Sequence, residues 1–270
     1  MKLNILRISG PLLALIALTW MPGGATAAEP DARSIVANSL QAFYYAAKDM
    51  RARVTMRLIN AQGQERKREM TMLRKNSGEG GEQRYYIYFH TPSDVKGTTF
   101  MVWKYLQKED DRWIFIPAIK LVRRIAADDK RSSFVGSDFT HEDVSGRSVD
   151  DETHSLLRTE EMAGRAVYVV ESKPKAQSDY ARRLSWIDQQ HGLPLKEEYF
   201  DTRDEKVRVF TADQVEQVDG HWTITVRTMK NLQTGHRTQT RFTDIKYDVG
   251  LKQNLFSERY LRNPPRKWIR

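Results

Sequence analysis

The stretch that decides the fold reads Gly97-Thr-Thr-Phe-Met-Val-Trp103, Asp111-Arg-Trp-Ile-Phe-Ile-Pro-Ala-Ile-Lys-Leu-Val-Arg-Arg-Ile125 and Ser133-Phe-Val-Gly-Ser-Asp-Phe-Thr-His-Glu-Asp143. Its first two blocks are rich in aromatic and β-branched residues, which favour strands, and the charged residues 108–111 between them mark a turn. Because successive side chains of a strand point to opposite faces, Trp113 and Phe115 share one face, while Ile114 and Ile116 share the other. Both faces are apolar. This predicts a strand packed on two sides, or a curved sheet with a lined concavity and a covered convex face.

The third block is apolar but interrupted. Gly136, Ser137 and Asp138 separate Phe134 from Phe139, and such residues favour turns and loops. The block is therefore predicted to be a tethered loop or a short helix that places Phe134 and Phe139 on the sheet.

Two of these runs carry a resemblance to a known family. Residues 112–125, followed by Phe134-Val-Gly-Ser-Asp-Phe-Thr-His-Glu-Asp143, resemble the outer-membrane lipoprotein-sorting family, whose members are periplasmic proteins similar to the LolA and LolB lipoprotein carriers. The resemblance covers most of the chain from about residue 32 onward and is most specific in these two runs. It implies a mainly β fold with a few helices: an open antiparallel half-barrel under a helical lid, with a hollow that holds an acyl chain.

The resemblance departs from the best-known carriers at one position. Those carriers hold the lid with a basic residue on an early strand. Arg74 or Lys75 stands in that region here, but the surrounding sequence does not match, so the role is not carried over. Members of this branch are also linked to lipid-exporting membrane transporters of the RND type, which leaves the cargo open between lipoproteins and other lipids.

The N-terminus has the features of a secretory signal. Lys2 and Arg7 form a positive end, residues 11–20 form an apolar run, and Ala25-Thr-Ala27 offers small residues for cleavage. The alternative is an uncleaved anchor, for which the apolar run is short. Residues 1–28 are therefore predicted to be removed, which places residues 29–270 in the periplasm as a single domain. The chain has no cysteine, so no lipid can be attached through one.

The net charge and the lack of cysteine limit the partners and the chemistry that are expected of this protein. The formal net charge is +9, and loss of Lys2 and Arg7 with the signal leaves +7. A basic exported protein can touch anionic lipid head groups transiently, whereas nucleic acid is an unsuitable partner because export and the dispersion of the charge argue against it. Without cysteine the chain has no disulfide, thiol nucleophile or thiolate metal site.

The rest of the chain predicts one helix and then a long meander of strands. Apolar residues Ile35, Val36, Leu40, Phe43 and Tyr44 recur at helical spacing within residues 31–48, behind Asp31 as the N-cap. From residue 54 the period changes to two. Strands are predicted around 54–58, 68–74, 85–89, three within 97–125, then 166–172, 182–188, 195–201, 206–213, 221–231 and 237–247. Residues 143–155 are predicted to be a connection, 256–261 a short closing helix, and the end from Pro264 a frayed tail.

The sequence contains no assembled motif for catalysis or for metal binding. The His141-Glu142-Asp143 cluster lacks a second histidine four residues on, because position 145 is serine. The acidic pair is expected to cap a helix or form salt bridges rather than to act as an acid and base. Ser137 lacks the glycine pattern of a hydrolase nucleophile. We therefore predict no catalytic residue, no metal site and no cofactor.

What remains is a set of aromatic and methionine side chains on an antiparallel sheet. An open sheet can enclose a ligand with such residues, and methionine adapts to varied acyl chains. The predicted lipid-binding residues are Met56, Met72, Tyr86, Tyr88, Met101, Trp103, Trp113, Phe115, Phe134 and Phe139. Trp113 and Phe115 are expected to face the hollow beside Met101 and Trp103. The first function is a carrier of lipid or lipoprotein acyl chains to or from the outer membrane; the alternative is a non-enzymatic accessory or sensor module that docks to an RND-type inner-membrane transporter or another envelope protein.

Overall fold

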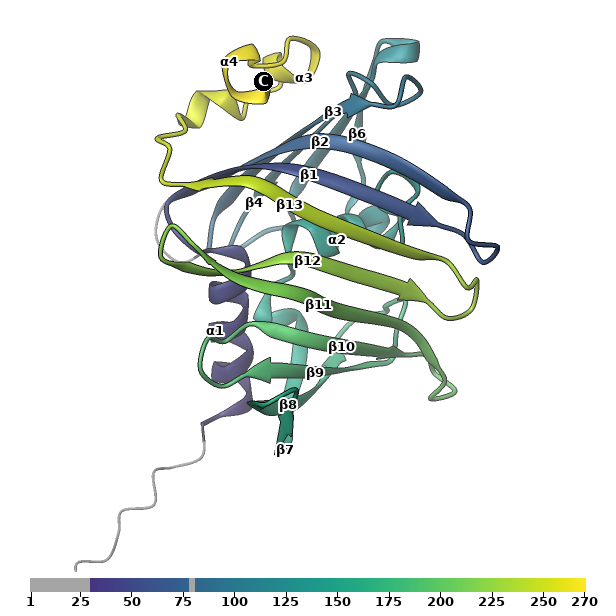
Figure 1. Cartoon of the computed structure of the whole chain (residues 1–270), viewed down its shortest axis with the longest axis vertical. Coiled ribbons are helices and arrows are strands. Elements are labelled where there is room, and N and C mark those ends of the chain that lie inside the picture. The colour runs from purple at the N-terminus through teal and green to yellow at the C-terminus, as the bar shows by residue number, and fades with distance from the viewer. Residues whose placement is uncertain (1–29, 78–80) are drawn as a thin grey trace, which may run out of the picture.

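One curved antiparallel sheet forms the body of the protein (Figure 1). The computed structural model describes residues 30–77 and 81–270, so the predicted signal at 1–28 lies outside the described residues. The sheet contains 13 strands in the order β6-β5-β4-β3-β2-β1-β13-β12-β11-β10-β9-β8-β7. Strands β6 and β7 are its free edges, so the sheet is not closed into a barrel. No helix in the described part of the chain is long and apolar enough to cross a membrane.

The sheet is built from two meanders that meet through the first and last strands. The first meander contains β1 (Asp49–Ile59), β2 (Glu65–Asn76), β3 (Gln83–Thr91), β4 (Thr99–Lys104), β5 (Asp111–Ile116) and β6 (Leu121–Ile125). The second contains β7 (Glu152–Met162), β8 (Arg165–Pro174), β9 (Arg182–Asp188), β10 (Pro194–Phe200), β11 (Lys206–Val218), β12 (His221–Asn231) and β13 (Arg237–Tyr247). Strand β1 pairs with β13, for example Val54 opposite Phe242, which joins the halves into one continuous sheet.

Helix α1 (Ala32–Tyr44) packs on the inner face of the curve. The Asp31 carboxylate accepts a hydrogen bond from the Ser34 amide at 3.0 Å, which confirms the predicted N-cap. Ile35 and Val36 of the predicted apolar stripe pack against Val170 and Ile187 of the sheet. The helix ends at Tyr44 rather than residue 48 because the chain turns through a positive φ at Ala47 before β1 begins.

The connection between β6 and β7 also lies within the curve and carries the short helix α2 (His141–Ser145) (Figure 1). Phe134 and Phe139 are both buried, which confirms that this segment places them on the sheet. The connection is shorter than predicted, since β7 begins at Glu152. Strand β7 is an edge strand that is largely exposed, so its sequence lacks the apolar alternation of a half-buried strand.

The C-terminal segment covers the outer face of β2 to β5. It contains the short 3₁₀ turn η5 (Gln253–Leu255) and the helices α3 (Arg259–Arg262) and α4 (Arg266–Ile269). The prediction of a frayed tail is wrong, because Leu261 and Ile269 are buried in one cluster with Leu73 and Met101 of the sheet. Backbone carbonyls of the segment accept hydrogen bonds from sheet side chains, for example at 2.7 Å from Trp103 Nε1 to Phe256.

Candidate functional site

Two small cavities lie between α1 and the inner face of the sheet. The first, of about 40 Å³, is bounded by Leu40 and Phe43 of α1 and by residues of β9 to β12. The second, of about 50 Å³, is bounded by the end of α1 and by residues of β1, β2, β3, β12 and β13. Phe43, Tyr44 and Arg227 line both cavities, so the two spaces adjoin at these three side chains.

The cavities are too small for a lipid in this conformation. A cavity of about 150 Å³ binds a benzene molecule, and about 10–15 Å³ of such space holds one water. Each cavity here therefore has room for only a few water molecules. A ligand larger than this would fit only if α1 or the connection that carries α2 moved away from the sheet.

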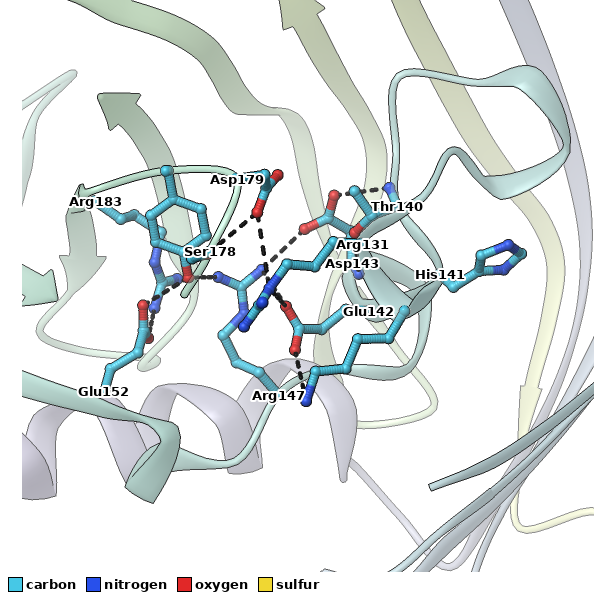
Figure 2. A network of polar contacts seen from close by, with 12 residues as sticks. Arg131, Thr140, His141, Glu142, Asp143, Arg147, Glu152, Ser178, Asp179 and Arg183 are labelled. Carbon is cyan, nitrogen blue, oxygen red and sulfur yellow. Dashed lines mark hydrogen bonds and ion pairs between the residues drawn. The ribbon is translucent and has the colours of Figure 1, made fainter. Parts of the chain in front are cut away.

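A buried ionic network holds the α2 connection in place (Figure 2). The Thr140 hydroxyl accepts a hydrogen bond from the Asp143 amide, and the Asp143 carboxylate accepts one from the Thr140 amide, which closes a capping box at the start of α2. Asp143 also accepts from Arg147 at 3.0 Å and from Arg208 of β11 at 2.6 Å. Burial opposes ionisation of Asp143, but Arg208 and Arg147 outweigh it and lower the pKa of this carboxyl.

The same network continues to β7 and β9. Arg147 donates to the Tyr180 hydroxyl at 2.6 Å, and that hydroxyl donates to the Glu152 carboxylate at 2.7 Å. Glu152 also pairs with Arg183 at 2.6 Å. Burial raises the pKa of Glu152, yet Arg183 and Arg147 overcome this and lower the pKa to about 2. Breaking such a pair typically costs about 3–5 kcal/mol, so the α2 connection is firmly anchored.

These contacts settle the roles of the acidic cluster. Glu142 and Asp143 are buried, and both lie within ion-pair distance of Arg147, while Asp143 alone caps α2, as the prediction of a helix cap or salt bridges allowed. His141 stacks on Phe100 with ring centroids 5.2 Å apart, and no cluster of metal-binding side chains occurs among residues 30–77 and 81–270. Ser137 donates its hydroxyl hydrogen to the Phe139 carbonyl.

We expect His141 to make the fold sensitive to mild acid. Burial, with the nearby Arg112 and Arg123, lowers the pKa of His141 from 6.5 to about 4, and Asp129 offsets this only in part. Below about pH 6.5 His141 is therefore protonated in the unfolded chain but not in the folded protein. The free energy of unfolding consequently falls as the pH drops toward 4. Between about pH 7 and pH 5 the loss should be about 2 kcal/mol. Urea denaturation of the wild type and of His141→Phe across this range measures it; equal pH dependence in both proteins would contradict the assignment.

The structure divides the predicted lipid-binding residues between the two faces of the sheet. Met56, Met72 and Phe134 belong to the cluster on the inner face of β1 to β5, and Phe139 lines the first cavity. Met72 also lines the second cavity. A contact of these four residues with lipid remains a prediction. The remaining predicted residues lie on the outer face beneath the C-terminal segment, namely Tyr86, Tyr88, Met101, Trp103, Trp113 and Phe115.

Trp113 and Phe115 were predicted to face the hollow, but they lie on the outer face of the sheet. Their predicted neighbours on the preceding strand are nevertheless correct. Met101 pairs with Trp113 across β4 and β5, and the rings of Trp103 and Trp113 are 5.0 Å apart. Both faces of β5 are apolar, so alternation alone does not say which face is concave. The C-terminal segment settles the matter by burying the Trp113 face.

Sequence analysis assigned no role to the basic residues of the inner face. Arg227 stands on β12 among Ile224, Val226 and Met229 and lines both cavities. Its only sequence signal is a charge within an apolar strand. Arg74 of β2 lines the second cavity and donates a hydrogen bond to the carbonyl of Ala46, just beyond α1. Lys75 instead points toward Asp49, at 4.0 Å.

Comparisons with known proteins agree on the fold. A family model described as an uncharacterized protein matches residues 81–263, and no curated protein matches the chain. The structure is similar to a DUF1329 family protein from Desulfovibrio piger, with TM-score 0.78 and 29% identity over 85% of this chain and 97% of that one. It is similar to a domain described as an outer membrane lipoprotein-sorting protein from Vibrio parahaemolyticus, with TM-score 0.79 and 30% identity over 86% and 98%.

A third solved structure has the same fold at lower identity. A LolA superfamily protein from Nitrosomonas europaea matches with TM-score 0.67 and 19% identity over 86% of this chain and 100% of that one. Together with the sheet order, these likenesses confirm the predicted fold class, a mainly β, LolA-like open antiparallel half-barrel with a few helices.

Proposed function

The chain belongs to the outer membrane lipoprotein-sorting protein family, and from this premise we propose that it is a periplasmic carrier of acyl chains. The observation that supports the proposal is the pair of adjoining cavities between α1 and the inner face of an open half-barrel. The cargo would be the acyl chains of lipoproteins or of other lipids, moved to or from the outer membrane. The protein would bind and release these chains without chemical change.

The free energy of exposing acyl chains explains why a carrier is needed. Burial of an acyl chain is worth about 0.8 kcal/mol per methylene, so two chains of about 16 carbons would cost on the order of 25 kcal/mol to bring into water. A protein that crosses the periplasm with such cargo must cover that surface.

The inner face has a composition suited to this task once α1 moves. The second cavity is lined by Met50, Met72, Phe242 and Ile245, and methionine side chains can repack around acyl chains of different shape. Helix α1 contacts the sheet chiefly through apolar residues, and its exposed ion pair between Arg33 and Asp150 adds little stability. We propose that α1 is the lid and that the anchored α2 connection forms the floor.

The proposal is tested by titrating the purified protein with a fluorescent fatty acid and comparing two methionine variants. Met72 lines the second cavity, whereas Met101 is buried on the outer face, and each variant to alanine removes the same atoms. Met72→Ala should weaken fatty-acid binding about tenfold, because an apolar contact with the chain is lost. Met101→Ala should leave the affinity unchanged. A wild type that binds no fatty acid would contradict the proposal, and equal affinity of the two variants would contradict the location of the site.

The small size of the cavities favours a second candidate function. A hollow filled by its own side chains suits a non-enzymatic accessory or sensor module that docks to an envelope protein, such as an RND-type transporter. The two candidates differ in whether the hollow ever opens. A protein that never admits an acyl chain would support docking, and one that does would support the carrier.

A further inference from the structure

Arg227 is a buried cation held among aromatic rings. It projects from the inner face of β12, and the residue is only 8% exposed. Its guanidinium carbon lies 5.1 Å from the ring centre of Phe43, 5.4 Å from that of Phe139 and 5.0 Å from that of Phe242. Cation–π contacts of this kind replace only a small part of the hydration that a buried cation loses.

Arg227 lacks the anionic partner that the neighbouring buried arginines possess. Arg147 pairs with Asp143, Arg183 with Glu152, and Arg112 with Asp110. Among residues 30–77 and 81–270, no carboxylate lies within ion-pair distance of the Arg227 guanidinium, and its buried Nε, like that of Arg112 and Arg183, has no hydrogen-bond partner. Arginine does not escape this situation by losing its proton, so a charged donor group remains available inside the protein.

The guanidinium of Arg227 lies where a ligand bound between α1 and the sheet would contact it. Arg227 lines both cavities together with Phe43 and Tyr44. In the second cavity a second cation, Arg74, is present, and its buried Nε also has no partner in the described part of the chain. That cavity is otherwise largely apolar, and one of its lining residues is the partly exposed Trp222.

We propose that Arg227 binds the anionic head group of the carried lipid, a carboxylate or a phosphate, while the acyl chain lies along the apolar lining of the second cavity. The inference rests on the proposed carrier function and adds the class of cargo to it. A guanidinium can donate two parallel hydrogen bonds to either anion. A neutral cargo would leave Arg227 without an anion in the loaded protein, whereas an acidic amphiphile supplies the missing partner. The preferred cargo is therefore an acidic lipid.

The experiment compares matched charged and neutral probes. The wild type is titrated with cis-parinaric acid and with its methyl ester, which share one acyl chain and differ in the head group. We expect the acid to bind at least about tenfold more tightly, as a charge-assisted hydrogen bond in a dry site would give. Arg227→Met should abolish this preference, and Arg227→Lys should keep part of it. Arg241→Met is the matched control, since Arg241 is exposed on the neighbouring strand β13.

The outcomes separate the two proposals. If the wild type binds neither probe, the carrier function itself is wrong. If it binds the acid and the ester equally, the proposed carrier function is retained and the proposed anionic site is overturned. This comparison uses the wild type alone, so it does not depend on whether a variant folds. Competition by phosphatidic acid and by oleic acid then distinguishes a phosphate from a carboxylate cargo. A preference for the acid that survives in Arg227→Met but not in Arg74→Met would move the site to Arg74 and overturn the assignment to Arg227.

Discussion

Replacing Trp113 by alanine is expected to lower the free energy of unfolding by about 3–5 kcal/mol and to leave fatty-acid affinity unchanged. Trp113 is only 7% exposed and belongs to the outer cluster that the C-terminal segment completes. Its ring meets the edge of Trp103, whose indole nitrogen donates to the carbonyl of Phe256. Truncation would leave a cavity between sheet and segment, on the side of the sheet opposite to α1. Urea denaturation and fatty-acid titration of the same variant measure both effects.

Trp222 provides the matched control for this experiment. It lines the second cavity and is 36% exposed, so its removal should cost little stability and should weaken fatty-acid binding. The alanine variants of Trp113 and Trp222 are thus expected to give opposite results in urea denaturation and in fatty-acid titration. If Trp113→Ala kept its stability and lost affinity, the outer face would have to contact the ligand, and the carrier site would lie under the C-terminal segment instead of under α1.

The strands could be predicted because their sequence pattern is local. The last two strands extend over residues 221–231 and 237–247, as the alternation of β-branched and polar residues indicated. The N-cap at Asp31 and the stripe of α1 follow from spacing within a few residues of one another. These features depend on neighbours in the chain, so a single sequence contains them.

The faces of the sheet could not be assigned in this way. Strand β5 is apolar on both sides, and the segment that covers its Trp113 face comes from residues 249–269, far along the chain. The tail looked frayed because its prolines and basic residues suggest solvent, yet Ile269 is buried against the sheet. The pairing of β1 with β13 likewise depends on residues about 190 positions apart, such as Val54 and Phe242.

The candidate site was hidden from sequence analysis for a related reason. Its lining mixes apolar side chains with buried arginines, and a charge within a strand ordinarily indicates a solvent-exposed face. Only the fold shows that Arg147 and Arg183 meet carboxylates, and that Arg227 meets none within the part of the chain that the structure describes. The packing of α1 on the sheet likewise depends on contacts between residues that are more than a hundred positions apart.

The role of α1 as a lid can be tested by a reversible crosslink, because the chain has no natural cysteine. Gly192 lies in the turn between β9 and β10, and a Cβ atom placed on it would be 3.4 Å from the Cβ of Ala42 in α1. Disulfides join Cβ atoms about 3.5–4.5 Å apart, so Ala42→Cys/Gly192→Cys should close with little movement. Gly192 has a φ of +69°, and a cysteine there costs about 1–2 kcal/mol.

We expect the oxidised Ala42→Cys/Gly192→Cys protein to lose at least about 100-fold in fatty-acid affinity, because apparent affinity falls with the population of the open state. Reduction should restore binding. The control is Ala61→Cys/Gly235→Cys, which joins the β1–β2 and β12–β13 turns at the end of the strands opposite to α1 (Figure 1). There the built Cβ lies 3.1 Å from that of Ala61 and φ is +72°, so the backbone strain is matched while α1 stays free. Unchanged binding by both oxidised proteins would mean that acyl chains enter without movement of α1, and that the α2 connection opens instead.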